Sequence, residues 1–161
     1  MGTNKVDFRM ARLVAATVLC LGGTATAGEF HTDKFSNCQV FLGDAQLGLR
    51  PQWHGPCVNG NAHGVGVVRL FENGNFYGAF FGTLAGGKWQ TGVLQTPTGY
   101  TAGTFIDNAV QSTDDRNVLI RAFDHGAMAA NRLADDFASK GNHESAKYYR
   151  EIARKLASQM D

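Results

Sequence analysis

The chain has 161 residues, of which 43% are hydrophobic and 18% are charged, with 15 basic and 14 acidic side chains. This length fits one ordinary domain or two very small ones. The nearly balanced charge gives no electrostatic reason to expect binding to nucleic acid or to anionic membranes.

The first 27 residues have the three-part pattern of a secretory signal peptide. Basic residues at Lys5, Arg9 and Arg12 precede an apolar stretch, residues 13–23, that is too short to span a bilayer. Small residues then follow up to Ala27, so we expect cleavage near Ala27 and a mature protein in the periplasm or outside the cell. A buried N-terminal helix is the alternative interpretation.

Two cysteines, Cys38 and Cys57, remain once the leader is removed. An even pair in an oxidising compartment predicts a disulfide that ties the N-terminal segment, residues 28–52, to the region after it. Closing this loop is worth roughly 3 kcal/mol in the chain-entropy model. Two free buried thiols are the alternative, and a metal site lacks the close Cys/His spacing it needs. We expect His31 and Asp33 to lie in a flexible part of this segment.

Residues 53–110 carry glycines at regular intervals inside strand-like segments. Asn73-Gly74 predicts a tight hairpin between residues 65–71 and 75–81. A longer turn with Pro97 predicts a second hairpin, between residues 87–94 and 100–106. The two hairpins are successive units of a repeat, and the recurring positions are Gly55, Gly78 and Gly103, then Cys57, Phe80 and Phe105, then Gly64 and Gly87.

The segment "WHGPCVNGNAHGVGVVRLFENGNFYGAFFG" carries a resemblance to a known repeat. Tyr77-Gly78, Gly64-x-Gly66, and Tyr100 with Gly103 match parts of the MORN repeat, and the resemblance covers about residues 53–108. It implies a curved antiparallel β-ribbon that binds proteins or, in some cases, lipids. It does not imply catalysis.

Residues 111–161 change to helical periodicity and predict an αα-hairpin. Ser112 to Asp115 resembles a capping box, and Lys140-Gly141-Asn142 ends one helix and caps the next. The segment "NRLADDFASKGNHESAKYYREIARKL" is similar to a single tetratricopeptide unit. Since one unit cannot form a peptide groove, we favour a hairpin that covers the open end of the β-ribbon. The sequence thus predicts an α+β fold.

Aromatic side chains crowd into the β-region, and two interpretations stay open. Either one sheet face packs on the helices and the other exposes anchors for a partner, or both faces are covered, the second by residues 30–49. Strand alternation places Phe76, Gly78 and Phe80 on one side and Tyr77, Ala79 and Phe81 on the other. Repeat equivalence makes the Phe80 side structural, so the candidate binding residues are Tyr77, Phe81, Trp89, Trp53 and Tyr100.

The sequence contains no common catalytic motif and no regular metal-ligand spacing, and we expect no catalytic residue, metal or cofactor. We predict an exported, non-enzymatic module that binds another protein, with immunity and inhibitor proteins as the analogy. Nucleic acid is not expected, and the charge does not indicate membrane contact. The alternatives are a small metal-dependent or hydrolytic enzyme that uses His54 and His63, and a lipid-binding structural protein of the cell envelope.

Overall fold

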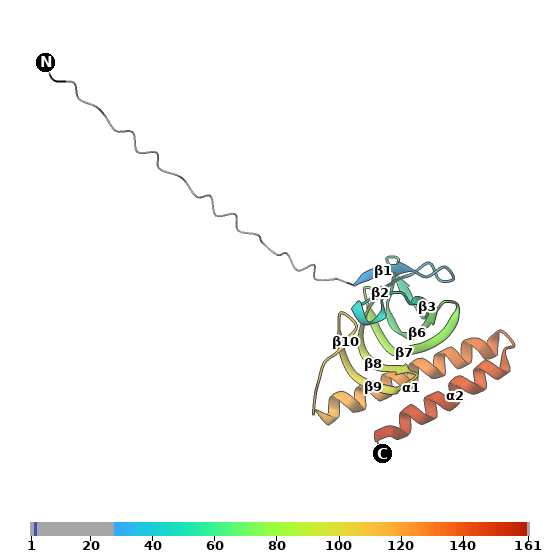
Figure 1. Ribbon diagram of the computed structural model, residues 1–161. Helices are drawn as coiled ribbons and strands as arrows, with labels where there is room; N and C mark the ends of the chain where they lie inside the picture. Colours follow the sequence, from blue (N-terminus) through green and yellow to red (C-terminus); the bar gives the residue numbers. More distant parts are fainter. Residues whose placement is uncertain (1, 3–27, 161) are drawn as a thin grey trace.

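The computed structural model describes Gly2 and residues 28–160, so the predicted leader lies outside the described residues. In the described part, strands are followed by two packed helices, which confirms the α+β class (Figure 1). The elements are β1 (Glu29–Thr32), β2 (Gln39–Leu42), η1 (Asp44–Gln46), β3 (Arg50–His54), β4 (Cys57–Val58), β5 (Asn61–Ala62), β6 (Gly64–Glu72), β7 (Asn75–Ala85), β8 (Lys88–Thr96), β9 (Gly99–Ile106), β10 (Ala109–Val110), α1 (Arg116–Ser139), α2 (His143–Ala157) and η2 (Ser158–Met160).

A six-stranded antiparallel sheet has the order β10-β9-β8-β7-β6-β3 and is called the large sheet. Both predicted hairpins are confirmed, since β6 pairs with β7 and β8 pairs with β9. Asn73 and Gly74 connect the first pair with φ values of 49° and 86°, a left-handed conformation that suits the twist of a two-residue hairpin loop. The large sheet begins at Arg50, earlier than the boundary expected at Trp53.

A second, four-stranded sheet has the order β1-β2-β5-β4 and is called the small sheet. The predicted disulfide is present, and it joins Cys38, just before β2, to Cys57 at the start of β4. The β2–β5 pairing is parallel and lies outside the antiparallel hairpins that the sequence predicted. The N-terminal segment and the repeat region therefore interleave, because β4 and β5 join the small sheet and β3 joins the large one.

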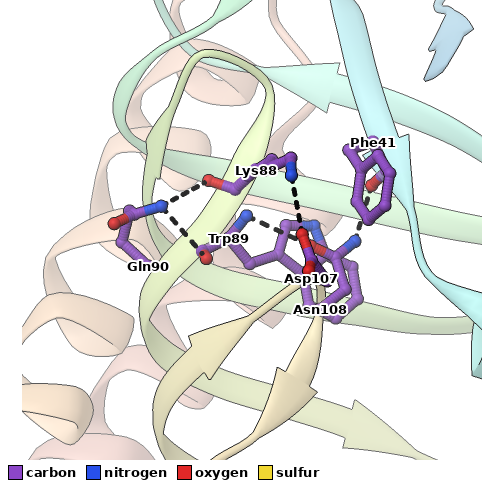
Figure 2. Close-up of polar contacts among 6 residues, drawn as sticks. All are labelled: Phe41, Lys88, Trp89, Gln90, Asp107 and Asn108. Carbon is purple, nitrogen blue, oxygen red and sulfur yellow. Dashed lines mark hydrogen bonds and ion pairs between the residues drawn. The ribbon is translucent and has the colours of Figure 1, made fainter. Parts of the chain in front are cut away.

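Asn108 links the small sheet to the large one (Figure 2). It is buried in the turn between β9 and β10, where its φ is 62°. Its side-chain oxygen accepts from the backbone N–H of Trp89 at 3.2 Å, and its amide nitrogen donates to the carbonyl of Phe41 at 2.5 Å. Beside it, the ammonium of Lys88 lies 2.6 Å from the carboxylate of Asp107. One side chain thus satisfies a polar group on β8 and another on β2.

The two helices form the predicted αα-hairpin. Asp115 caps α1 through its side chain, and Asn142 caps α2 by accepting from the N–H of Ser145 at 3.1 Å. Gly141, at φ 77°, makes the turn between them. Gly126 marks a close contact, because a Cβ there would lie 3.1 Å from Val93 of the sheet.

The large sheet is covered on both faces (Figure 1). Its convex side packs on α1 and α2 in the helix-side core, which includes Val67, Phe81, Val93, Leu133 and Leu156. Its concave side packs on the small sheet in the second core, which includes Val40, Leu42, Phe80, Trp89 and Phe105. The interpretation in which residues 30–49 cover the second face is therefore confirmed.

The glycines inside the strands make room for aromatic rings on the concave face. Four glycines form one row across strands β6 to β9, because each is paired with the next on the neighbouring strand. They are Gly66, Gly82, Gly92 and Gly103. A Cβ at Gly82 or Gly92 would lie 2.8 Å from Cζ of Phe80, and one at Gly66 would collide with the ring of Trp53. The row therefore lets these rings lie directly on the backbone.

Candidate functional site

Three of the five predicted binding residues, Phe81, Trp89 and Trp53, are buried. Phe81 and Trp89 are both fully buried, so neither is free to anchor a partner. Phe81 belongs to the helix-side core, where its ring centroid lies 6.3 Å from that of Tyr149. Trp89 stacks on Phe80 in the second core, with ring centroids 4.5 Å apart. The expectation that they face outward is wrong because both sheet faces are occupied.

Two β-bulges explain why alternation misplaced the aromatic residues. A register shift at Thr83/Leu84 pairs Leu84 with Trp89 and skips a residue, which turns Trp89 toward the Phe80 side. A second shift at Leu70/Phe71 leaves Tyr77 unpaired between two register pairs. Tyr77 consequently packs against the second core and not with Phe81. Strict alternation fails at each bulge.

The remaining predicted residues do not share a surface. Tyr77 is half-buried against the second core, and Tyr100 is half-buried against the helix-side core, with the Lys155 ammonium 5.0 Å from its ring centre. Trp53 is 2% exposed and donates its indole N–H to the carbonyl of Pro56 at 2.9 Å. Of the five, Trp53 lines the cleft described next.

An open cleft of about 550 Å³ lies between the edge strand β3 and the end of α1, and is called the edge cleft. Trp53, Val65 and Leu133 supply its apolar lining, and His54 lies among them. Its polar lining residues are Ser36, Gln52, Arg132, Asp136 and Lys140, and Phe35 borders it from the turn between β1 and β2. The cleft thus combines an apolar lining with a few polar groups, as binding sites commonly do.

Phe35 is the most exposed of the large apolar side chains that the structure describes, at 80%. Its turn is held by Asp33, which is 2% exposed and therefore does not lie in a flexible segment as expected. The Asp33 carboxylate accepts from the N–H of Phe35 at 3.1 Å, and from the N–H and hydroxyl of Ser36 at 3.1 and 2.6 Å. A fourth hydrogen bond comes from the N–H of Trp53 at 3.1 Å. The backbone that carries the exposed ring is thus held beside the cleft by a buried acid.

Sequence reasoning missed Asp33 and Phe35, although a local signal was present. An aspartate followed by a serine three residues later, as in Asp33-Lys34-Phe35-Ser36, is typical of a turn in which the carboxylate accepts backbone N–H groups. An apolar residue inside such a turn has no neighbouring strand to pack on.

The edge strand β3 is protected against strand addition. Pro51 has no backbone N–H, and the N–H of Trp53 already donates to Asp33. A partner strand would therefore find few donors on this edge. The edge cleft must bind through side chains and not by extending the sheet.

His54 is a neutral group in this cleft at physiological pH. Burial, and secondly the nearby positive charge of Arg69, lower the pKa of His54 from 6.5 to about 4, and the carboxylates of Asp136 and Asp33 oppose this shift. Its ring centroid lies 6.0 Å from that of Phe137. Its Nε2 atom is buried and has no hydrogen-bond partner among the described residues. A neutral imidazole can both donate and accept a hydrogen bond.

The structure does not bring together the two histidines of the enzyme alternative. His63 is exposed and does not line the edge cleft that contains His54. Among the described residues, no group of three or more His, Cys, Asp or Glu side chains could hold a metal ion. Ser36, the one hydroxyl residue among those lining the cleft, donates to the Asp33 carboxylate and not to His54.

Comparisons of the chain with protein-family models, with curated proteins and with solved structures gave no match. The MORN and tetratricopeptide resemblances therefore stay predictions. Within residues 28–160, no helix has the length and apolar character needed to cross a bilayer. The disulfide between Cys38 and Cys57 is compatible with a periplasmic or extracellular location.

Proposed function

We propose that the protein is an exported, non-enzymatic module that binds another protein through Phe35 and the edge cleft. The observation that carries this proposal is the 80% exposure of Phe35 on a turn held by four hydrogen bonds to Asp33. Exposed aromatic side chains are the usual anchors of protein interfaces. Because the backbone of its turn is already held, Phe35 loses mainly side-chain entropy on binding.

The cleft beside Phe35 supports the same proposal. It can accept one or two side chains of a partner, and His54 in its lining is uncharged. The predicted leader and the disulfide favour a partner that is itself exported. Neutralisation of that partner, as immunity and inhibitor proteins do, is the role we propose by analogy of class.

Capture from the exported fraction of the native host tests this function. The wild-type protein should retain one stoichiometric partner, and Phe35→Ala should weaken that binding by about 2 kcal/mol, or roughly 30-fold. Ile106→Ala is the matched control, since Ile106 is 60% exposed on β9 and lines neither the edge cleft nor a second hollow, of about 340 Å³, that Phe35 also lines. Equal loss in both variants, or retention of a partner by Phe35→Ala at full affinity, would contradict the proposal.

A further inference from the structure

Phe35 stands between two hollows whose charged side chains are mostly basic. The edge cleft is lined by Arg132 and Lys140, and a neighbouring hollow of about 340 Å³ is lined by Lys34 and Arg50. Phe35 and Gln52 line both hollows. The four cations are exposed and surround the most exposed aromatic ring of the described chain.

The two carboxylates that line the same hollows already have hydrogen-bond or ion-pair partners within the protein. Asp33 is buried, and its oxygens accept the four hydrogen bonds that hold the turn. Asp136 lies 2.7 Å from the ammonium of Lys140, and this pair cancels one of the four positive charges. The side chains of Lys34, Arg50 and Arg132 make no hydrogen bond or ion pair with any residue that the structure describes. With the buried Asp33 carboxylate counted as negative, four cations line these hollows against two carboxylates, so an excess of positive charge surrounds Phe35.

This concentration of charge is local. The whole chain carries a formal net charge of +1 at pH 7, so the rest of the molecule compensates for it. Another basic hollow, lined by Asn131, Lys147, Arg150 and Arg154 of the two helices, has no aromatic side chain in its lining. In that hollow Arg150 is paired with Asp135 at 3.1 Å. Only the surface around Phe35 joins unpaired cations to an exposed ring among these basic hollows.

We propose that the partner surface received by Phe35 and the edge cleft is an acidic polypeptide segment with apolar residues between its carboxylates. This inference rests on the proposed function and names the chemistry of the partner. The carboxylates would lie against Arg132, Arg50 and Lys34, and the apolar residues would contact Phe35 and the apolar lining of the cleft. Such charge complementarity mainly raises the association rate and selects the partner.

A polypeptide fits this surface better than a phosphate polymer or a lipid headgroup. The edge cleft has Trp53, Val65 and Leu133 in its lining and a neutral imidazole at His54, which suit side chains and not phosphates. Recognition of nucleic acid typically uses many phosphate contacts along a basic stripe, and three unpaired cations around a ring do not form one.

Short synthetic peptides test the inference with the purified protein. Three matched sets would combine leucine and phenylalanine with glutamate, with glutamine or with lysine, and fluorescence anisotropy would give their dissociation constants at low and high salt. We expect the glutamate set to bind about 10-fold more tightly than the glutamine set at low salt, because steering by opposite charges acts on this scale, and the difference should shrink at high salt. The lysine set should bind weakest.

Variants locate the effect. Arg50→Glu combined with Arg132→Glu should remove the preference for glutamate, whereas Lys147→Glu combined with Arg154→Glu makes the same charge change on the other basic hollow and should retain it. Phe35→Ala should weaken binding of both the glutamate and the glutamine sets.

The outcomes separate the inference from the function on which it rests. Equal binding of the glutamate and glutamine sets, with a loss in Phe35→Ala, would overturn the acidic partner but keep the binding module. Equal loss in both charge-reversed variants would also overturn the inference. Tighter binding of phosphatidylglycerol vesicles or single-stranded DNA than of the glutamate set would replace it with a lipid or nucleic-acid ligand. If no peptide set binds, or if Phe35→Ala changes nothing, both proposals fail.

Discussion

Phe80 and Phe81 are adjacent on β7 and belong to the two different cores of the molecule. Because both rings are fully buried, Phe81→Ala should lower the free energy of unfolding by about 3–5 kcal/mol, as much as Phe80→Ala. Phe35→Ala is the control and should change it by less than about 0.5 kcal/mol, since that ring is exposed. Denaturant unfolding measures all three, and a stable Phe81→Ala variant would mean that the helices do not cover this face.

His54 should make the protein less stable in acid. Its pKa in the folded state, about 4, lies below the unfolded value of 6.5, so the unfolded chain binds the proton first. The stability that comes from keeping His54 neutral is complete above pH 6.5 and is lost as the pH falls toward 4. Between those limits the wild type should lose up to about 3 kcal/mol more than His54→Gln, which does not titrate. Parallel unfolding curves of the two proteins across this range would contradict the assignment.

At the scale of residues, the sequence could place those side chains that follow a regular pattern. Phe80 and Phe105 occupy equivalent repeat positions, and their rings pack edge to face with centroids 5.2 Å apart. Trp89 and Tyr77 could not be placed, because the bulges that turn them depend on how strands pair across a turn. Phe35 was missed because exposure of a single ring depends on what packs around its turn.

Among the elements, Asn108 strengthens the contact between the two sheets, which also share the second core. Asn108→Gly keeps the left-handed backbone accessible but removes the side chain, so the N–H of Trp89 and the carbonyl of Phe41 lose their partner. We expect a loss of about 2–3 kcal/mol in unfolding free energy, because buried polar groups left unpaired are costly. Asn131→Ala, on an exposed helical position, should change it by less than about 0.5 kcal/mol. Similar effects of the two substitutions would show that Asn108 does not join the sheets.

The disulfide should stabilise the small sheet. Cys57→Ser opens the loop between Cys38 and Cys57 and should lower the free energy of unfolding by about 3 kcal/mol. Reduced wild-type protein should unfold at the same denaturant concentration as the variant. Rapid alkylation of both thiols in native, unreduced protein would contradict the bridge.

Local signals in the sequence identified the longer elements. Asn73-Gly74 predicted the β6–β7 hairpin, and Asn142 predicted the start of α2, because each acts on its own neighbours. The small sheet was not predicted as a sheet. Its strands have two to four residues, and its pairing of β2 with β5 joins positions that are far apart in the sequence. Such short strands carry too little periodicity to be recognised.

For the molecule as a whole, both faces of the large sheet are covered, so the binding surface that we propose is not the sheet face that the sequence predicted. The helices occupy its convex face and the small sheet its concave face, so most aromatic residues of the repeat region stabilise the fold. The exposed ring that we propose as an anchor, Phe35, lies instead at one edge of the large sheet, beside the edge cleft and the end of α1. The aromatic composition of the β-region predicted a binding face on the large sheet. Because the sheet lies between the helices and the small sheet, those aromatic side chains belong to the two cores instead.

Hydrogen–deuterium exchange of the protein, alone and with the partner that it captures, tests this central claim most directly. We predict slower exchange on binding in residues 33–36, in residues 52–56 and around Arg132 to Lys140, which together border the edge cleft. The hairpin loop at Asn73-Gly74 and the turn between β8 and β9 should exchange as in the free protein. Protection of those two turns, with no change in residues 33–36 and 52–56, would show that the partner binds the repeat region and not the edge cleft.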